Sequence, residues 1–156
     1  GEAQRRVGVP DAQLAAMGHD TETSEFACGF ILLRGDRTLL LHHAEGHWAP
    51  PKGRVEPGET EIEAAHRELA EETGLTGVRI IDGFRHEISY LKARDGTEIP
   101  KRVLFFLAES PSGDVQLSDE HTASAWLAWD AALERATHAG TREALAAAHK
   151  FRRQQL

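Results

Sequence analysis

The sequence predicts an α/β fold, a single domain that combines β-strands with α-helices, and three observations carry this prediction. The chain has 156 residues, 40% of them hydrophobic and 28% charged, which is the size and balance of one globular domain. Apolar segments of strand length are separated by turn sequences, and they occupy residues 26–33, 38–41, 78–90 and 99–108. Between the second and third of them, residues 60–73 have the periodicity and both end signals of a helix.

The first elements in chain order are a hairpin and a rigid segment. The turn-forming sequence Arg34-Gly35-Asp36-Arg37 predicts that strands 26–33 and 38–41 are antiparallel. Residues 47–53 contain two adjacent prolines, which exclude a helix and favour extended backbone. We therefore expect a rigid loop or an edge strand there.

The helix at 60–73 is followed by further strands and helices. Thr60 and Glu63 have the spacing of a capping box, and Gly74 is a helix stop signal. Strands at 78–90 and 99–108 are expected to be joined by a turn at 94–97, with a short strand at 123–129. A short helix at 130–137 and a C-terminal helix from Gly140 towards Phe151 complete the prediction.

The start of the chain is expected to lie outside this domain. Residues 1–24 are polar and predict an N-terminal extension without a fixed place in the fold, whereas residues 25–156 form the single domain. Residues 1–16 precede the only methionine, Met17, so we expect them to be an added or upstream segment without a role in function.

Composition limits the classes of function. The formal charge is −7, from 18 Lys and Arg against 25 Asp and Glu, so we expect no nucleic-acid partner. Cys28 has no second cysteine to pair with, and the longest apolar run, 103–108, is far short of a membrane span. These features predict a cytoplasmic protein without membrane contact, and they leave its oligomeric state open. An anionic substrate would require local basic side chains or a bound cation.

Three carboxylates share one flank of the helix at 60–73. At 100° per residue, Glu68, Glu71 and Glu72 fall within an arc of about 100° beside the apolar stripe. Like charges at these spacings destabilise a helix by a few tenths of a kcal/mol per pair, which a bound cation would offset. Oxygen ligands suit Mg²⁺, or Mn²⁺, better than Zn²⁺. A solvated acidic face is the alternative interpretation.

A longer spacing pattern decides between the two interpretations. From Gly53 the sequence has five residues, Glu59, seven residues, and then Arg67-Glu68-Leu69-Ala70-Glu71-Glu72-Thr73-Gly74-Leu75. This stretch resembles the Nudix box at every fixed position, and a chance match has a probability of roughly 10⁻⁷ at ordinary residue frequencies. The resemblance implies the Nudix fold, an α/β/α sandwich around a mixed β-sheet, and hydrolysis of a nucleoside diphosphate linked to another group.

The resemblance also implies roles for the residues of the box. Glu68, Glu71 and Glu72 would hold divalent cations, together with the backbone carbonyl of Gly53. Glu59 and Arg67 would orient the loop and the helix. A divalent metal would neutralise the phosphate oxygens and lower the pKa of a coordinated water.

Outside the box the chain is similar to asymmetric diadenosine tetraphosphate hydrolases, over most of residues 26–135. The matching segments are 29–32, 48–59, 83–84, 118–121 and 126–127. This similarity implies Mg²⁺-dependent cleavage of diadenosine tetraphosphate to ATP and AMP, with the small-molecule nucleotide as partner. It makes Glu120 the candidate for a base or an additional metal ligand, against a solvated loop carboxylate.

The same similarity suggests substrate-binding side chains. Tyr90 and Lys101 correspond to a phosphate-binding hydroxyl and cation, and Lys52 would extend a basic rim. Trp48 and Phe84 are candidate adenine-stacking faces, against core packing for Phe84. A zinc site at His42, His43 and His47 is disfavoured because adjacent strand residues point to opposite faces and no cysteine pair lies nearby.

Two other functions stay open at this stage. The same chemistry could act on a nucleoside triphosphate, a diphosphoinositol polyphosphate or the 5′ end of RNA, because substrate choice lies outside the box. Alternatively, the domain could be a non-catalytic nucleotide sensor, although a sensor has no need for three mutually repelling glutamates.

Overall fold

A computed structural model describes residues 25–110 and 112–155 of the chain. The predicted N-terminal extension therefore lies outside the described residues. No helix in the described ranges is both long and apolar enough to cross a membrane.

The described part of the chain is built around one mixed sheet of eight strands. Its central pair, β1 and β7, runs parallel from the Glu25–Lys101 pair to the Leu33–Glu109 pair, and the other pairings are antiparallel. The strands are β1 (Glu25–Arg34), β2 (Arg37–His43), β3 (Trp48–Ala49), β4 (Lys52–Arg54), β5 (Arg79–Ile80), β6 (His86–Arg94), β7 (Thr97–Glu109) and β8 (His121–Ala128).

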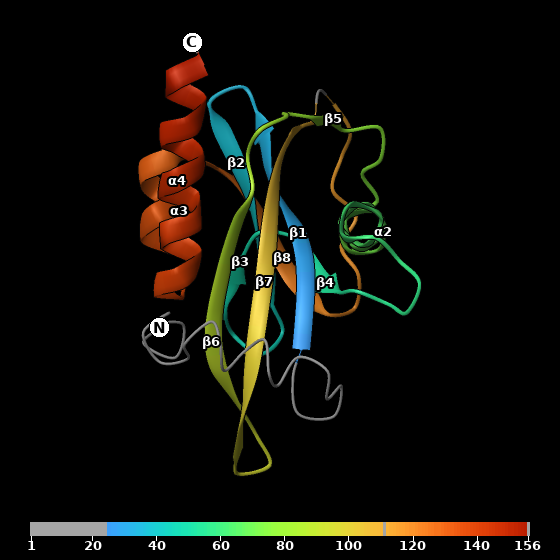
Figure 1. Ribbon diagram of the computed structural model, residues 1–156. Coiled ribbons are helices and arrows are strands. Elements are labelled where there is room, and N and C mark those ends of the chain that lie inside the picture. Colours follow the sequence, from blue (N-terminus) through green and yellow to red (C-terminus); the bar gives the residue numbers. More distant parts are fainter. Residues whose placement is uncertain (1–24, 111, 156) are drawn as a thin grey trace.

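Helices cover both faces of the sheet, which gives three layers (Figure 1). Helix α2 (Glu61–Thr73) lies on one face, and α3 (Trp129–Arg135) with α4 (Ala139–Gln155) lies on the other. Each interface has its own apolar core, with Phe30 and Leu69 on the α2 side and Phe105 and Leu145 on the other. The alternation of side chains along β1 and β7 supplies both cores, because neighbouring residues of a strand point to opposite faces. The α/β/α sandwich implied by the sequence is confirmed.

Most elements lie where the sequence predicts them. The first hairpin turns at Gly35, and the two prolines separate β3 from β4, which pairs with β1 at the sheet edge. The β6–β7 hairpin turns at Asp95 and Gly96, which both have positive φ, as a two-residue turn of this kind requires. The C-terminal helix begins at Ala139 and continues four residues past Phe151.

The single strand predicted at 78–90 is wrong. The structure has two strands there, β5 and β6, separated by a turn at Asp82 and Gly83. Gly83 has a φ of 95°, which a continuous strand does not allow. Before the break β5 pairs with the end of β7, and after it β6 forms a long antiparallel hairpin with β7. The tip of this hairpin extends beyond the rest of the sheet (Figure 1).

The start of α2 is fixed by a reciprocal cap, which gives a first testable prediction. The Thr60 hydroxyl accepts a hydrogen bond from the Glu63 backbone N–H, and the Glu63 side chain accepts one from the Thr60 N–H. Thr60→Ala is expected to lower the free energy of unfolding by about 1 kcal/mol. Thermal unfolding should then show a Tm lower by about 3 °C. An unchanged Tm would mean that packing of α2 on the sheet alone defines its start.

Candidate active site

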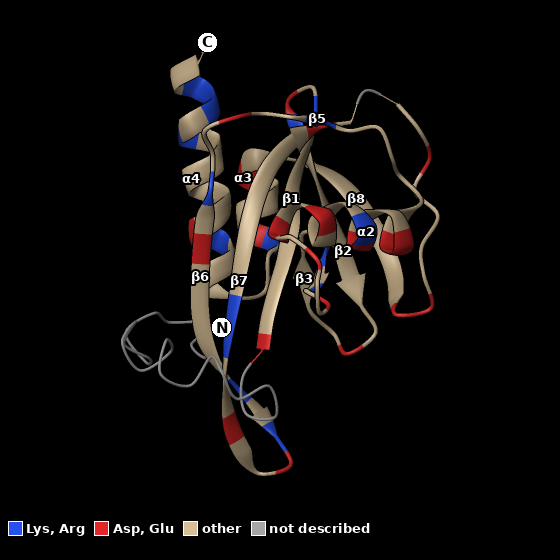
Figure 2. Cartoon of the chain, turned by 45° about the vertical axis from the view of Figure 1, so that its right-hand side comes forward, with Lys and Arg blue, Asp and Glu red and all other residues tan. Residues whose placement is uncertain are grey.

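A pocket of about 450 Å³ lies between the β4–α2 side of the sheet and the β6–β7 hairpin. Its lining combines acidic, basic and imidazole side chains: Glu45, Glu68, Glu72 and Glu120, then Lys52, Arg54, Lys92 and Lys101, then His43, His47, His121 and His138. Figure 2 shows acidic segments on α2 and a basic segment on β7. The lysines of the lining come from the strands β4, β6 and β7, whereas two of its glutamates come from α2. The pocket is therefore suited to a ligand that needs both a cation site and direct cationic contacts.

The acidic side is made where α2 packs against β4. Glu68 lies directly against Gly53, where an added Cβ would overlap its carboxylate. The Lys52 backbone N–H donates a hydrogen bond to Oε1 of Glu72 at 3.1 Å. Glu72 is only 5% exposed, and burial, followed by the neighbouring Glu68, raises the pKa of Glu72 to about 9. These two carboxylates are thus held together at a cost that an added cation would remove.

This arrangement fits a divalent metal ion. Glu68 and Glu72 are one helical turn apart, and both line the pocket. Buried carboxylates are paired or coordinate metals, because an isolated buried charge is strongly unfavourable. Their donor set consists of carboxylate oxygens, which suits a hard cation. The close approach of Gly53 to Glu68 also explains why this position of the box carries a glycine.

The contact between Gly53 and Glu68 gives a second prediction. Gly53→Ala is expected to push the Glu68 carboxylate out of place and to weaken metal binding by at least about tenfold. Thermal unfolding at increasing MgCl₂ measures this effect as a higher metal concentration at half-maximal stabilisation. Circular dichroism at low temperature checks that the variant is folded. A metal response equal to that of the wild type would contradict the role of Gly53 as a cradle for Glu68.

Arg67 organises the flank of the pocket. Its Nε donates to Oε2 of Glu59 at 2.6 Å, and its Nη2 donates to Oε1 of the same carboxylate at 3.0 Å. Nη1 donates to Glu68 at 2.9 Å and to Glu71 at 3.2 Å, while Nη2 also reaches the backbone carbonyl of Arg54. One guanidinium therefore connects the β4–α2 loop to two of the helix carboxylates.

The predicted site residues fall into three groups in the structure. Seven of them line the pocket: Lys52, Gly53, Glu68, Glu72, Tyr90, Lys101 and Glu120. Three do not line it and form the adjoining ion-pair network: Glu59, Arg67 and Glu71. Glu71 is exposed and contacts Arg67, so the three glutamates do not share one environment.

The two predicted stacking residues lie outside the pocket lining. Phe84 is buried in the core beside α4, with its ring centroid 5.6 Å from that of Phe151. Trp48 is half-buried, and its ring contacts His42 and the guanidinium of Arg135. The assignment of Phe84 to adenine stacking is therefore wrong, because the side chain packs in the core. Trp48 is likewise in contact with protein groups and is not part of the pocket lining.

Four histidines of the lining come from three separate segments. His43 and His47 stack at 4.6 Å across the β2–β3 turn, His121 meets His43 edge-on, and His138 precedes α4. Of these four histidines, only His43 and His47 lie close enough in the sequence to be recognised as neighbours. His121 follows Glu120 directly, and His138 is too distant in the sequence for any spacing argument to connect it.

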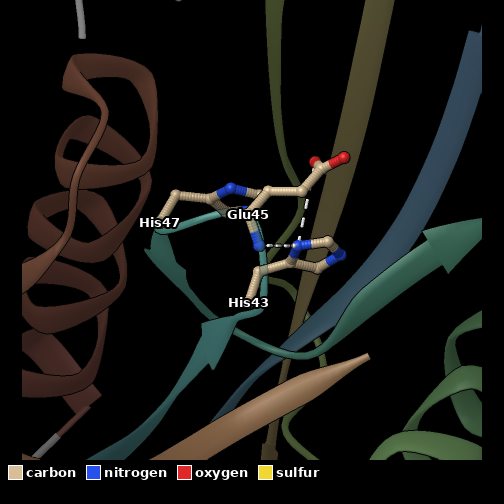
Figure 3. A group of neighbouring side chains, drawn as sticks. All are labelled: His43, Glu45 and His47. Carbon is tan, nitrogen blue, oxygen red and sulfur yellow. Dashed lines mark hydrogen bonds and ion pairs between the residues drawn. The ribbon is translucent and has the colours of Figure 1, made fainter. Parts of the chain in front are cut away.

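His43, Glu45 and His47 each offer a ligand atom within 4.8 Å of the others (Figure 3). His42 contacts Thr122 instead, in agreement with the expected opposite orientation of neighbouring strand residues. Nδ1 of His43 accepts the Glu45 backbone N–H at 3.0 Å, and the two imidazole planes differ by only 9°. Ring nitrogens bind metals in the plane of the ring, so these two rings do not converge on one ion as they stand.

Comparison with known proteins identifies the family. The NUDIX domain model matches residues 24–148. The bis(5′-nucleosyl)-tetraphosphatase [asymmetrical] of Rattus norvegicus is 40% identical over 141 residues, covering 80% of this chain and 93% of the relative. The corresponding protein of Sus scrofa gives the same identity and the same coverage.

Solved structures agree with this relationship. An Ap4A hydrolase from C. elegans, solved as a binary complex, superposes with a TM-score of 0.73 at 33% identity, covering 81% of this chain and 96% of that one. The dihydroneopterin triphosphate pyrophosphohydrolase of E. coli superposes with a TM-score of 0.65 at 23% identity, covering 77% and 91% of the two chains. That second similarity supports the fold alone. The fold, the box and these comparisons together show that the chain belongs to the NUDIX family and is a NUDIX hydrolase.

Proposed function

We propose that this protein hydrolyses diadenosine tetraphosphate asymmetrically to ATP and AMP, with Mg²⁺ as its metal. The observation that carries the proposal is the pocket itself, which sets Glu68 and Glu72 beside Lys52, Lys92 and Lys101. A tetraphosphate needs both kinds of contact, because its negative charges must be neutralised along their whole length. The 40% identity to the rat and pig enzymes, over 93% of their length, supports this choice of substrate.

Hydrolases of the family generally use a divalent metal, and we propose which residues hold it here. Glu68 and Glu72 would be the principal ligands, with Glu71 and the Gly53 carbonyl as further ones. Bound Mg²⁺ supplies charge neutralisation at the phosphate oxygens and a lower pKa for a coordinated water. The hydrogen bonds of Arg67 to Glu59 and Glu68 would fix the β4–α2 loop against the helix, so that the ligands stay close to one another.

The basic and aromatic side chains of the pocket would bind the rest of the nucleotide. Lys52, Lys92 and Lys101 contact phosphates that lie away from the acidic side. The rings of Tyr90 and His138 line the pocket, with planes 18° apart and centroids 6.4 Å apart. Such near-parallel faces offer a platform for a nucleobase, a contact worth about 1 to 3 kcal/mol per base. This platform replaces Trp48 and Phe84 in our assignment of the adenine contact.

We propose that Glu120 accepts the proton of the attacking water. It is exposed within the pocket lining, and its loop is tied to the β2–β3 turn because the Ala44 N–H donates to the Glu120 carbonyl at 2.8 Å. The water oxygen forms a new bond to one phosphorus, and the bond from that phosphorus to the bridging oxygen breaks. The bridging oxygen leaves with the electron pair, and the carboxylate of Glu120 accepts the water proton.

Hydrolysis in ¹⁸O-labelled water tests the proposed function. The wild-type protein is incubated with MgCl₂ and diadenosine tetraphosphate, and mass spectrometry locates the label in the products. ATP and AMP in equal amounts, with the label in only one of them, are expected, and the labelled product identifies the phosphorus attacked. Two molecules of ADP would contradict asymmetric cleavage. No turnover would overturn the substrate assignment, and triphosphates, diphosphoinositol polyphosphates and capped RNA would then be tried.

Matched variants connect this activity to the pocket. Glu120→Gln is expected to lower kcat about a hundredfold with little change in KM, as loss of a general base does. Glu61→Gln serves as the control for removing a carboxylate charge, because Glu61, at the start of α2, pairs with Arg85 at 2.8 Å and lies outside the pocket lining. If wild-type protein binds the nucleotide in calorimetry and shows no turnover at any metal concentration, the non-catalytic sensor becomes the better interpretation.

A further inference from the structure

We propose that Glu25, at the start of β1, is a positioning residue for the basic wall of the pocket. This wall consists of Lys52, Lys92 and Lys101, and Glu25 holds it in its charged, substrate-binding arrangement. This inference rests on the proposed function and concerns a carboxylate that lies outside the box and outside the pocket lining. Its side chain is only 3% exposed. A carboxylate so deeply placed needs cationic partners, and the structure provides three.

The sheet register brings these partners to Glu25. Glu25 is directly paired with Lys101 of β7, and Lys101 is directly paired with Tyr90 of β6. Residues at every second position of a strand share a face, so Lys92 and Arg94 follow Tyr90 on the same side of β6. Oε1 of Glu25 lies 3.5 Å from Nζ of Lys101 and 3.6 Å from Nζ of Lys92, and Oε2 contacts Arg94.

Two of these three partners belong to the pocket. Lys92 and Lys101 both line it, together with Lys52, whereas Glu25 stays behind them. Three lysines around one small cavity repel one another, and their side chains have many rotamers. Glu25 offsets part of that repulsion and fixes the ammonium groups of Lys92 and Lys101 without itself lining the pocket. Both ammonium groups can therefore still donate to phosphate oxygens inside the pocket.

Lys101 depends on this contact most. It is 8% exposed, and burial, followed by Lys52 and Lys92, lowers the pKa of Lys101 to about 7, whereas Glu25 acts in the opposite direction. Tyr90 of β6 is the cross-strand neighbour of Lys101, and Arg94 shares Glu25 with it. His47 also acts on Lys101, and burial and Lys52 lower the pKa of His47 to about 3. His47 therefore stays neutral between pH 6 and 8. Without Glu25 the pKa of Lys101 would fall further, so a larger fraction of Lys101 would be deprotonated at each pH in this range and the wall would carry less charge.

The charge of Lys101 is measured first, without any substrate. Protein labelled with ¹³C at lysine Cε is titrated by NMR, with Lys101→Arg used to assign the resonance. In Glu25→Gln, the Lys101 titration midpoint is expected to fall by about one pH unit. Glu25→Asp, which keeps the charge, should restore most of it. Glu87→Gln is the matched control, because Glu87 pairs with Arg102 on the same two strands at 3.6 Å but on the opposite face.

The consequence for binding is measured on the same variants with diadenosine tetraphosphate. Glu25→Gln is expected to raise KM about tenfold at pH 8 and less than threefold at pH 6, with kcat changed less than twofold, because protonation of Lys101 at low pH compensates. The internal phosphates of this substrate do not titrate in that range. An unchanged midpoint, or a shifted midpoint with unchanged KM, would overturn the role of Glu25. Absence of turnover in the wild type would count against the proposed function, while the midpoints would still decide whether Glu25 keeps Lys101 charged.

Discussion

Replacing Glu72 with glutamine is expected to remove most of the activity and, at the same time, to stabilise the metal-free protein. Glu72 is more buried than Glu68 and Glu71, and it lines the pocket beside Glu68. Loss of a principal metal ligand removes several kcal/mol of transition-state stabilisation, so kcat/KM should fall by about a thousandfold or more. Glutamine keeps the shape of the side chain and can still accept the Lys52 N–H, so the fold is retained.

The gain in stability should depend on pH in a defined direction. The pKa of Glu72 is about 9 in the folded protein, against 4.5 for an unperturbed glutamate, with burial as the main cause and Glu68 as the next. Between these values the folded protein keeps a proton that the unfolded chain has lost. The free energy of unfolding of the wild type therefore falls as pH rises from about 5 towards 9, whereas the glutamine variant lacks this contribution.

Urea unfolding of metal-free protein measures the difference. The two proteins should have similar stability near pH 4.5, and Glu72→Gln should be more stable by several kcal/mol at pH 8. Added MgCl₂ should reverse the order, because it stabilises only a protein that binds it. Glu61→Gln should follow the wild type in every condition. Parallel pH profiles for wild type and Glu72→Gln would show that the carboxylates are not strained in the absence of metal.

The fold was predictable where local signals and tertiary packing agree. The capping box at Thr60 and the stop at Gly74 define α2 within one residue, because the same residues satisfy the helix ends in the folded protein. The region 78–90 was mispredicted because its apolar composition suits a strand throughout, whereas Gly83 adopts a positive φ that composition does not reveal. The assignment of helices to opposite faces came from the family resemblance, since periodicity alone does not specify which side of a sheet a helix covers.

Within the box the candidate site was predictable from spacing along the helix, whereas Tyr90, Lys101 and Glu120, which also line the pocket, were predictable only through the resemblance to the family. Spacing along one helix places Glu68 beside Glu72, but it does not show that Glu71 is exposed and paired with Arg67. Glu25 and His138 reach the neighbourhood of the pocket through the sheet register and the start of α4, over separations at which no sequence motif operates. Phe84 was misassigned because an aromatic residue has the same sequence signal whether it stacks on a base or packs in the core.

Arg67→Lys is expected to lower kcat/KM about a hundredfold even though the positive charge is kept. The guanidinium makes two parallel hydrogen bonds to Glu59 and also reaches Glu68, Glu71 and the Arg54 carbonyl. A lysine has one compact ammonium group, so it cannot bridge the loop and the helix carboxylates simultaneously. Small displacements of aligned catalytic groups are enough to cause losses of this size.

The metal dependence separates this positioning role from a simple loss of stability. The Mg²⁺ concentration at half-maximal activity should rise at least about tenfold in Arg67→Lys, as expected when outer contacts of metal ligands are removed. Arg79→Lys is the control, because Arg79 is highly exposed and forms its ion pair with Glu109, remote from the pocket lining. Its activity should stay within twofold of the wild type. An Arg67→Lys protein with normal metal dependence and a reduced Tm would assign Arg67 to folding, because the ligands would then be aligned without its hydrogen bonds.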